Sequence, residues 1–384
     1  MNENSVKKIK KTIKEILLNP QINESYPYVE YKTDLFEIIA KELNNRKIDY
    51  KIDYSLCLVI FEKMERNLDK VNILSNDARL SEFVDSVFNI YANTPFLYDV
   101  DFHFYKLRKF PVLHENSSVS LKQGKISTSL FFDDEFENYA IVRVKAKGVY
   151  TGSYPNSFMK GVMQSLNILI FILILNDVIT FDYMDKYLPS ILSSVQGIDE
   201  NKITIDVVNH EFPNFSTHSK LSSVIENYYS KLIFDSGEVS ALAVYNAFYI
   251  ANEIINDNDK EILRIKSAID WYIHSNITED ETMAFIQACM GLESIFGDDD
   301  SEGGLTAILS DRCAYLIGKN IKDRREIKKT FREIYKIRSK IIHGVRSFLN
   351  ENEKIMLFMA RQYLRESILK ELGNLGLLTQ SQQR

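Results

Sequence analysis

The absence of proline from the last part of the chain is the feature that most constrains its fold. All seven prolines of the 384-residue sequence lie at or before Pro213, so residues 214–384 contain none. Proline disrupts helix interiors because it has no N–H to donate and its ring collides with the preceding turn. The long proline-free stretch therefore favours an all-helical carboxy-terminal region that follows an amino-terminal region of mixed structure.

Six segments of the proline-free stretch repeat apolar residues at the spacing of an amphipathic helix. They cover residues 239–255, 260–274, 281–296, 305–317, 322–343 and 353–372. Polar or glycine-bearing joints of about four to nine residues separate them, a length typical of helices that pack as antiparallel neighbours. Residues 238–375 are therefore predicted to form an all-α helical bundle.

The first part of the chain, residues 1–230, is predicted to be an α+β region. Residues 6–18 and 35–46 carry helical apolar spacing, whereas residues 140–149 alternate with the period of two that is typical of a strand. Residues 158–175 predict a helix, and its most apolar stretch is far shorter than the ~20 residues of a membrane-spanning helix. We expect this helix to be buried in the core, and we expect no association with a membrane.

Composition narrows the class of protein further. The chain is 45% hydrophobic and 26% charged, which favours a folded globular protein, and its net charge of −6 argues against a uniformly basic surface. Three well-separated cysteines provide neither a disulfide framework nor a cysteine-rich metal site. The basic amino terminus lacks the apolar segment of a signal peptide, so a cytoplasmic location is expected.

Motifs that bind a metal or a cofactor are not found in the sequence. No phosphate-binding GxxxxGK[ST], dinucleotide-binding GxGxxG, zinc-binding HExxH or nucleophile-bearing GxSxG motif occurs. Residues 297–304 (GDDDSEGG) resemble a calcium loop, but Leu309 stands where the bidentate glutamate belongs. His210, Glu211 and His218 lack a regularly spaced further ligand. We therefore expect no metal and no cofactor.

Residues 322–343 place an arginine on the apolar side of a predicted helix. Ile327, Phe331, Ile334, Arg338 and Ile341 recur at helical spacing. A buried guanidinium is costly unless it is paired or lines a pocket, because it stays charged. Five residues later, His343 precedes Gly344, the residue type that most readily ends a helix in the left-handed conformation. In an ideal helix, His343 lies about 140° around the axis from Arg338.

Two further charged residues fall on apolar rows of neighbouring predicted helices. Glu293 lies on the row of Ile286, Cys289 and Phe296, and Arg312 lies on the row of Leu305, Leu309 and Leu316. Buried charges persist when they are paired, so Glu293 is predicted to bind Arg312 or Arg338. Such a network either holds an arginine for a function or merely fixes the helix register.

Basic residues are concentrated in the same helix. Residues 319–346 contain eleven Lys and Arg against three acidic residues. On the side away from the apolar row lie Arg325, Lys329, Arg332, Lys336 and Lys340. A run of this density is either an ordinary solvated face or a surface for a polyanion, and we favour binding of a phosphate backbone.

The helix carries residues that resemble a known family. Tyr335, Arg338, Ser339, His343 and Gly344 fit a Y-x-x-R-S-x-x-x-H-G form of the R-x4-6-H signature of HEPN domains. The resemblance is strongest to the Apea-like HEPN branch, whose preceding helices are similar to residues 291–296 and 311–314. It covers residues 238–372, and the amino-terminal region shows no comparable similarity.

The resemblance implies a homodimer in which two copies of the motif face each other and form a metal-independent endoribonuclease. His343 would act as general acid or base and Arg338 as the clamp on the phosphate. Glu293 would orient Arg338 or its neighbours, with Arg312 as a supporting residue. Ser339 would support the site as a polar group, and Tyr335 would either stack a base or pack. A toxin or anti-phage role, with RNA such as tRNA as substrate and a trigger recognised by the amino-terminal region, follows from the family alone.

Two other functions remain open from the sequence. The first makes residues 238–375 a non-catalytic module that binds RNA or protein or mediates dimerisation. Alternatively, the chain is an enzyme whose chemistry lies in the amino-terminal region.

Overall fold

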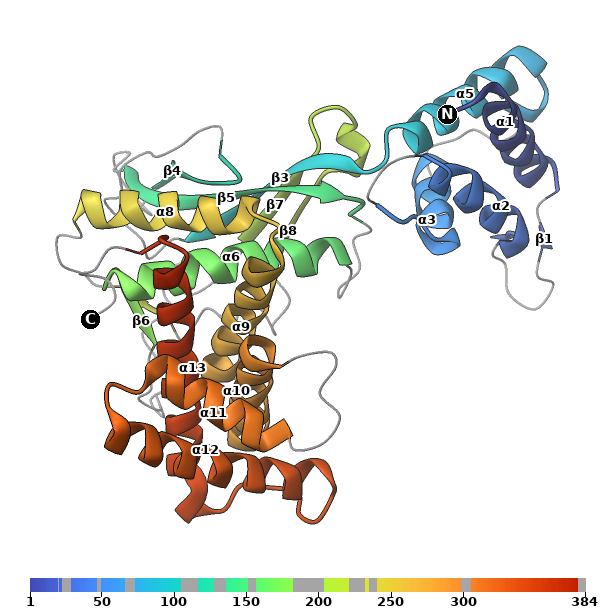
Figure 1. Ribbon diagram of the computed structural model, residues 1–384. Coiled ribbons are helices and arrows are strands. Elements are labelled where there is room, and N and C mark those ends of the chain that lie inside the picture. Colours follow the sequence, from blue (N-terminus) through green and yellow to red (C-terminus); the bar gives the residue numbers. More distant parts are fainter. Residues whose placement is uncertain are drawn as a thin grey trace. The chain divides into compact units, whose positions relative to one another are not determined.

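The computed structural model of the chain is shown in Figure 1. It describes residues 1–19, 21–22, 29–46, 50–65, 73–104, 117–127, 136–150, 157–181, 204–220, 232–234, 240–297 and 305–378. Helices make up the amino-terminal part, a small sheet follows in the middle, and a helical region ends the chain. The predicted order of a mixed region before an all-helical region is therefore confirmed.

Two compact units interleave along the chain. The first comprises Met1–Val100, Lys145–Gly161 and Asp206–Thr217, and the second comprises Asp101–Val144, Val162–Ile205 and His218–Arg384. The predicted division into residues 1–230 and 238–375 stays a prediction. Most residues at that boundary, 221–231 and 235–239, lie outside the part of the chain that the structure describes.

The first unit contains a group of amino-terminal helices. These helices are α1 (Glu3–Leu18), α2 (Thr33–Asn44), α3 (Tyr54–Glu65) and α5 (Asp77–Ala92), with β1 (Gln21–Ile22) and β2 (Val29–Glu30) as an antiparallel pair. Ile13, Phe36 and Phe61 are fully buried between the helices. Arg46 donates to the main-chain oxygens of Tyr91 and Ala92 and so satisfies carbonyls at the end of α5.

The sheet has five strands in the order β4-β5-β3-β7-β8. Its members are β3 (Phe96–Phe104), β4 (Val119–Ser127), β5 (Phe136–Gly148), β7 (Thr204–Val208) and β8 (Thr217–Lys220). β5 covers residues 140–148 of the predicted strand 140–149, and it pairs with β4 in antiparallel register, with Val119 opposite Val144. Between β7 and β8 lies the short 3-10 helix η1 (Pro213–Phe215). Two further strands, β6 (Ile179–Phe181) and β9 (Leu232–Phe234), form a separate antiparallel pair.

The apolar helix α6 (Ser157–Leu175) is long and apolar enough to cross a membrane, but about two thirds of it is buried inside the protein. This burial is typical of the core helix of a soluble protein, as the sequence predicts. Asn167, which interrupts the most apolar stretch of this helix, is fully buried and donates from Nδ2 to the carboxylate of Asp270. That hydrogen bond explains how an amide is tolerated inside the core.

The second unit holds all six predicted carboxy-terminal helices. They are α8 (Ala241–Asn256), α9 (Lys260–Ile277), α10 (Glu281–Phe296), α11 (Leu305–Ile317), α12 (Ile321–Ile342) and α13 (Lys354–Asn374), preceded at α13 by the 3-10 turn η2 (Glu351–Glu353). Ser240, Asp259, Asp280 and Asn320 accept main-chain N–H groups at four of the helix starts.

Helix α10 is central to this bundle because it packs against α9, α11, α12 and α13 (Figure 1). Gly291 allows the close approach of α13, since a Cβ at this position would collide with the side chain of Leu364. Phe285, Leu292 and Leu364 are fully buried in the resulting core. The bundle thereby fixes one side of α12 and leaves its other side exposed.

Candidate active site on helix α12

The site is built on α12, whose two ends are both defined by hydrogen bonds. At its start, Oδ1 of Asn320 accepts from the N–H of Asp323 over 3.0 Å. At its end, Gly344 has a φ of +68°, and the N–H of Val345 donates to the carbonyl of Lys340 over 2.9 Å. Gly344 therefore ends the helix in the left-handed conformation, as predicted, and His343 is the C-cap residue.

The apolar side of α12 packs into the bundle. Ile327, Phe331 and Ile334 are buried, as the helical spacing predicts. Tyr335 lies beside them, with its ring stacked on Phe331 at a centroid distance of 4.7 Å and its hydroxyl 3.4 Å from the carbonyl of Cys289. Of the two roles considered for Tyr335, the structure places it in packing, where its ring is not accessible to a base.

Arg338 is held by Glu293 across the contact between α12 and α10. Its Nη2 donates to Oε2 of Glu293 over 3.0 Å and lies 2.9 Å from Oε1. Both side chains are about one quarter exposed, so the pair lies at the edge of the core. Burial raises the pKa of Glu293 above its ordinary value, although the charge of Arg338 and a hydrogen bond from Tyr335 act in the opposite direction.

Arg312 is not part of this pair, so the prediction that it points into the same core is wrong. Its side chain is exposed, and Nη1 donates to the carbonyl of Phe296 over 2.6 Å. The buried residues that the structure describes on α11 are Leu309, Ser310, Cys313, Ala314 and Ile317. Arg312 lies beside the face that they form instead of within it, and its long side chain reaches solvent.

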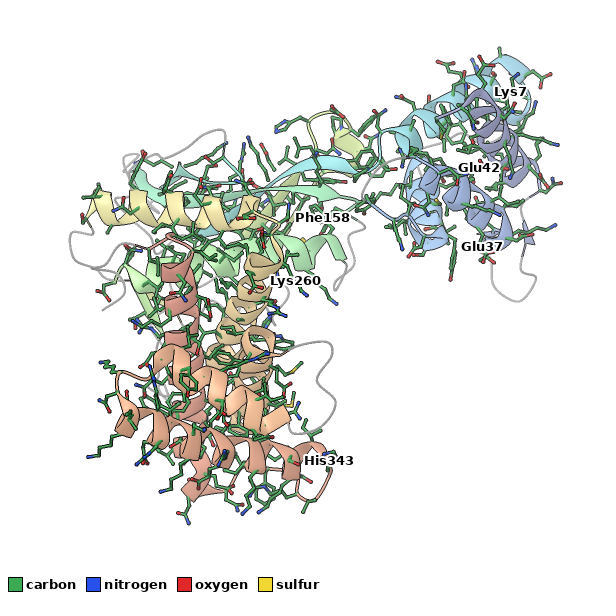
Figure 2. All side chains as sticks on the ribbon, viewed as in Figure 1. Lys7, Glu37, Glu42, Phe158, Lys260 and His343 are labelled. Atoms are coloured by element: carbon green, nitrogen blue, oxygen red, sulfur yellow. The ribbon has the colours of Figure 1, made fainter. Side chains whose placement is uncertain are left out.

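His343 lies on a different side of α12 from Arg338. Figure 2 shows it at the end of the helix, beside the loop that leads to α13. His343 and Ser339 are both exposed, whereas Arg338 is held against α10. One copy of the chain thus presents the two motif residues about 140° apart around the helix axis.

The exposed basic residues of α12 form one continuous surface with His343. We call Arg325, Lys329, Arg332, Lys336 and Lys340 the basic face; all five are exposed. Their spacing of three or four residues places them on one side of the helix. His343, eighteen residues or five full turns after Arg325, lies on the same side. Within the described residues, none of the five takes part in an ion pair. Their charge is therefore available to a polyanion.

The loop after His343 is fixed by residues that the sequence analysis did not identify. Nη1 of Arg346 lies 2.6 Å from Oε2 of Glu353, and the N–H of Leu349 donates to Oγ1 of Thr282 over 3.0 Å. Burial alone would raise the pKa of Glu353, but hydrogen bonds from Arg346 and the Asn350 N–H lower it below the ordinary value. In the sequence, Asn350 is followed three residues later by Glu353, a spacing that predicts a capping box. This capping box is observed at η2.

The positions considered for a metal show no cluster of ligands. Among the residues that the structure describes, no group of three His, Cys, Asp or Glu could hold a metal ion. His210 lies at hydrogen-bond distance from Asp99, 3.1 Å from its carboxylate. Of the calcium-like segment 297–304, residues 298–304 lie outside the described residues.

Helix α12 thus carries a fixed arginine on one side, and an exposed histidine and a basic face on another. An arginine can bind a phosphate and a histidine can move a proton, but one copy of the chain does not direct Arg338 and His343 at the same point. Comparison of the chain with protein-family models, with curated proteins and with solved structures finds no match.

Proposed function

We propose that the chain is a HEPN-type endoribonuclease, located in the cytoplasm, that cleaves RNA without a metal and acts as a homodimer. The observation that carries the proposal is the R-x4-H spacing on α12, in which Glu293 holds Arg338 and His343 is exposed at the end of the basic face. A role as a bacterial toxin or in anti-phage defence, with tRNA or another RNA as the target, is proposed from the family resemblance.

The chemistry follows from what RNA and these side chains supply. The ribose 2′-OH is the nucleophile, and His343 takes its proton or gives one to the leaving 5′-oxygen. The guanidinium of Arg338 stabilises the negative charge that develops on the non-bridging oxygens of the in-line phosphorane. The expected products are a 2′,3′-cyclic phosphate (or 3′-phosphate) and a 5′-OH. DNA has no 2′-OH and should resist cleavage.

A second copy of the chain is part of the proposal. Arg338 and His343 lie about 140° apart on one helix, so a single copy does not direct both at one phosphate. A two-fold axis would bring His343 of one copy towards Arg338 of the other. Around the end of α12, Ile342, Val345 and Phe348 are more than half exposed, which provides apolar area for such a contact.

A non-catalytic module is the second candidate, and one observation favours it. Arg338 already binds a carboxylate on α10, as expected of an ion pair that fixes the packing of two helices. In that case the basic face would bind RNA, or the exposed apolar residues a protein, without cleavage.

The deciding experiment compares the wild type with His343→Ala and Arg338→Ala on total RNA in EDTA, with mapping of the new 5′ ends. His218→Ala, which changes an exposed histidine away from α12, is the matched control. Discrete 5′-OH ends in the wild type and control, absent in both variants while these remain folded and dimeric, support the nuclease. Normal cleavage by either variant contradicts it, and RNA binding without cleavage by any protein favours the module.

A further inference from the structure

An exposed aromatic ring on α11 lies beside the start of α12, against the residue that precedes the basic face. Tyr315 of α11 is 66% exposed, among the most exposed of the large apolar residues that the structure describes. The guanidinium carbon of Arg324 lies over its ring, 4.9 Å from the centroid. A cation held over an aromatic face is a favourable contact that also fixes the orientation of the ring.

The joint between α11 and α12 holds this pair in place. Nε of Arg324 lies 3.4 Å from the carbonyl of Gly318, and the side chain fills the space that a Cβ on Gly318 would need. The N–H of Lys319 donates to Oδ2 of Asp323 over 2.9 Å, which closes the turn between the helices. One turn further along the same seam, Lys328 forms an ion pair with Asp311. The contacts of the joint thus hold the Tyr315 ring in a fixed position.

Tyr315 and Arg324 lie at the end of α12 opposite to His343. Arg325, the first residue of that face, directly follows Arg324, and His343 lies nineteen residues after Arg324 at the other end of the helix. At 1.5 Å per residue, about 28 Å of α12 separates the two ends. Arg324 lies about 100° around the helix axis from Arg325, so a strand that follows the basic face from His343 and turns towards α11 at Arg325 would reach Tyr315 over several nucleotides.

We propose that Tyr315 and Arg324 form a stacking platform for a nucleobase of single-stranded RNA that lies along the basic face. The platform supplies a flat aromatic surface, and the lysines and arginines of the face supply the charge that matches a phosphate backbone. The preferred substrate is an unpaired segment, because the bases of a duplex already stack on each other and do not present a face to a protein side chain. The inference rests on the proposed function for its choice of RNA as ligand.

The binding experiment uses the full-length chain with His343→Ala, so that the RNA stays intact. Affinity for a short single-stranded RNA is measured by fluorescence anisotropy at several salt concentrations. Loss of base stacking costs about 1–3 kcal/mol, so Tyr315→Ala should weaken binding by about 5- to 150-fold. Tyr315→Phe keeps the aromatic face and should retain most of the affinity. The slope of affinity against salt should be unchanged, because no charge is removed.

A matched control is available on α8 of the same unit. Tyr249 is 54% exposed, so Tyr249→Ala removes a similar aromatic surface away from the basic face and should leave RNA affinity unaltered. Binding of duplex RNA should be the same with and without Tyr315. The platform is contradicted if Tyr315→Ala binds the single strand with the same affinity as the parent protein. It is also contradicted if the variant loses the same amount of affinity for single-stranded and duplex RNA.

Cleavage provides a readout that separates this inference from the proposed function. In the chain with His343 intact, Tyr315→Ala should lower kcat/KM for a long single-stranded substrate but not for the dinucleotide UpA, which is too short to span α12. If the wild type neither binds nor cleaves RNA, the proposed function fails and the platform with it. If the wild type cleaves both substrates and Tyr315→Ala changes neither rate, only the platform is wrong.

Discussion

Arg338 of α12 donates from Nη2 to Oε2 of Glu293 on α10 over 3.0 Å, on the side of the helix that faces away from His343. The ion pair fixes the direction of the guanidinium and joins two helices of the bundle. Because the pair lies only partly in solvent, its protonation and its geometry both affect the fold. The stability of the protein and the behaviour of the candidate site can therefore be tested with the same variants.

The stability of the wild type, measured against a Glu293→Gln variant that cannot titrate at this position, should fall as pH rises. Its pKa in the folded state is raised above the ordinary value of 4.5, mainly by burial. A raised carboxylate pKa contributes stability that is present below the unfolded pKa and is lost as pH rises through the folded pKa. The unfolding free energy of the wild type minus that of Glu293→Gln should thus fall as pH rises above 4.5. Urea denaturation at several pH values above 4.5 measures this change. A difference in unfolding free energy that stays constant with pH would contradict the prediction.

Glu353 should show the opposite dependence on pH. Burial would raise its pKa, but the hydrogen bonds from Arg346 and the Asn350 N–H outweigh burial and lower it below 4.5. Its stabilising contribution is therefore present above the unfolded pKa and is lost as pH falls through the folded pKa. Wild type should exceed Glu353→Gln in unfolding free energy near neutral pH, and this advantage should disappear on acidification. Equal acid sensitivity of the two proteins would show that the pair with Arg346 does not form.

Gly344→Ala should destabilise the protein through the backbone alone. Gly344 has a φ of +68°, and no atom lies within 4 Å of an added Cβ. The left-handed conformation costs an alanine about 1–2 kcal/mol. Gly376, with a φ of +73° and equally open surroundings, is a matched control after α13. Both variants should lose similar unfolding free energy in chemical denaturation, whereas only Gly344→Ala should also reduce RNA cleavage, since it alters the cap that carries His343.

Neutralising two residues of the basic face should weaken RNA binding in a manner that depends on salt. Each phosphate contact contributes roughly one unit to the slope of log affinity against log salt, so Lys329→Gln with Arg332→Gln should lower this slope by about 1–2. Lys7 and Lys260 are exposed lysines outside the basic face (Figure 2), and their replacement by Gln is the control. Anisotropy titrations in increasing salt measure the slope; equal slopes for all proteins would exclude the basic face as the RNA surface.

Local patterns determined much of the helical region from the sequence alone. The predicted spans 281–296 and 305–317 coincide with α10 and α11, because apolar spacing, N-cap residues and helix-ending glycines act within a few residues. Gly344 ended α12 where predicted for the same local reason. Helices α3 and α5 were not predicted from the sequence, although Asn76 provides an N-cap for α5. Periodicity also placed Arg338 on the packed side of α12.

Only the tertiary structure decided which charged groups meet. Sequence spacing placed both Glu293 and Arg312 on apolar rows of their helices. In the structure, Glu293 binds Arg338, whereas Arg312 reaches solvent beside Phe296. The rotation of α11 about its axis made this difference, and that rotation is set by how Leu309 and Cys313 pack against neighbouring helices. The contacts of Arg346 with Glu353 and of Arg324 with Tyr315 depend on the same packing. Sequence periodicity determines the faces of one helix, whereas a contact between two helices depends on the position and rotation of both.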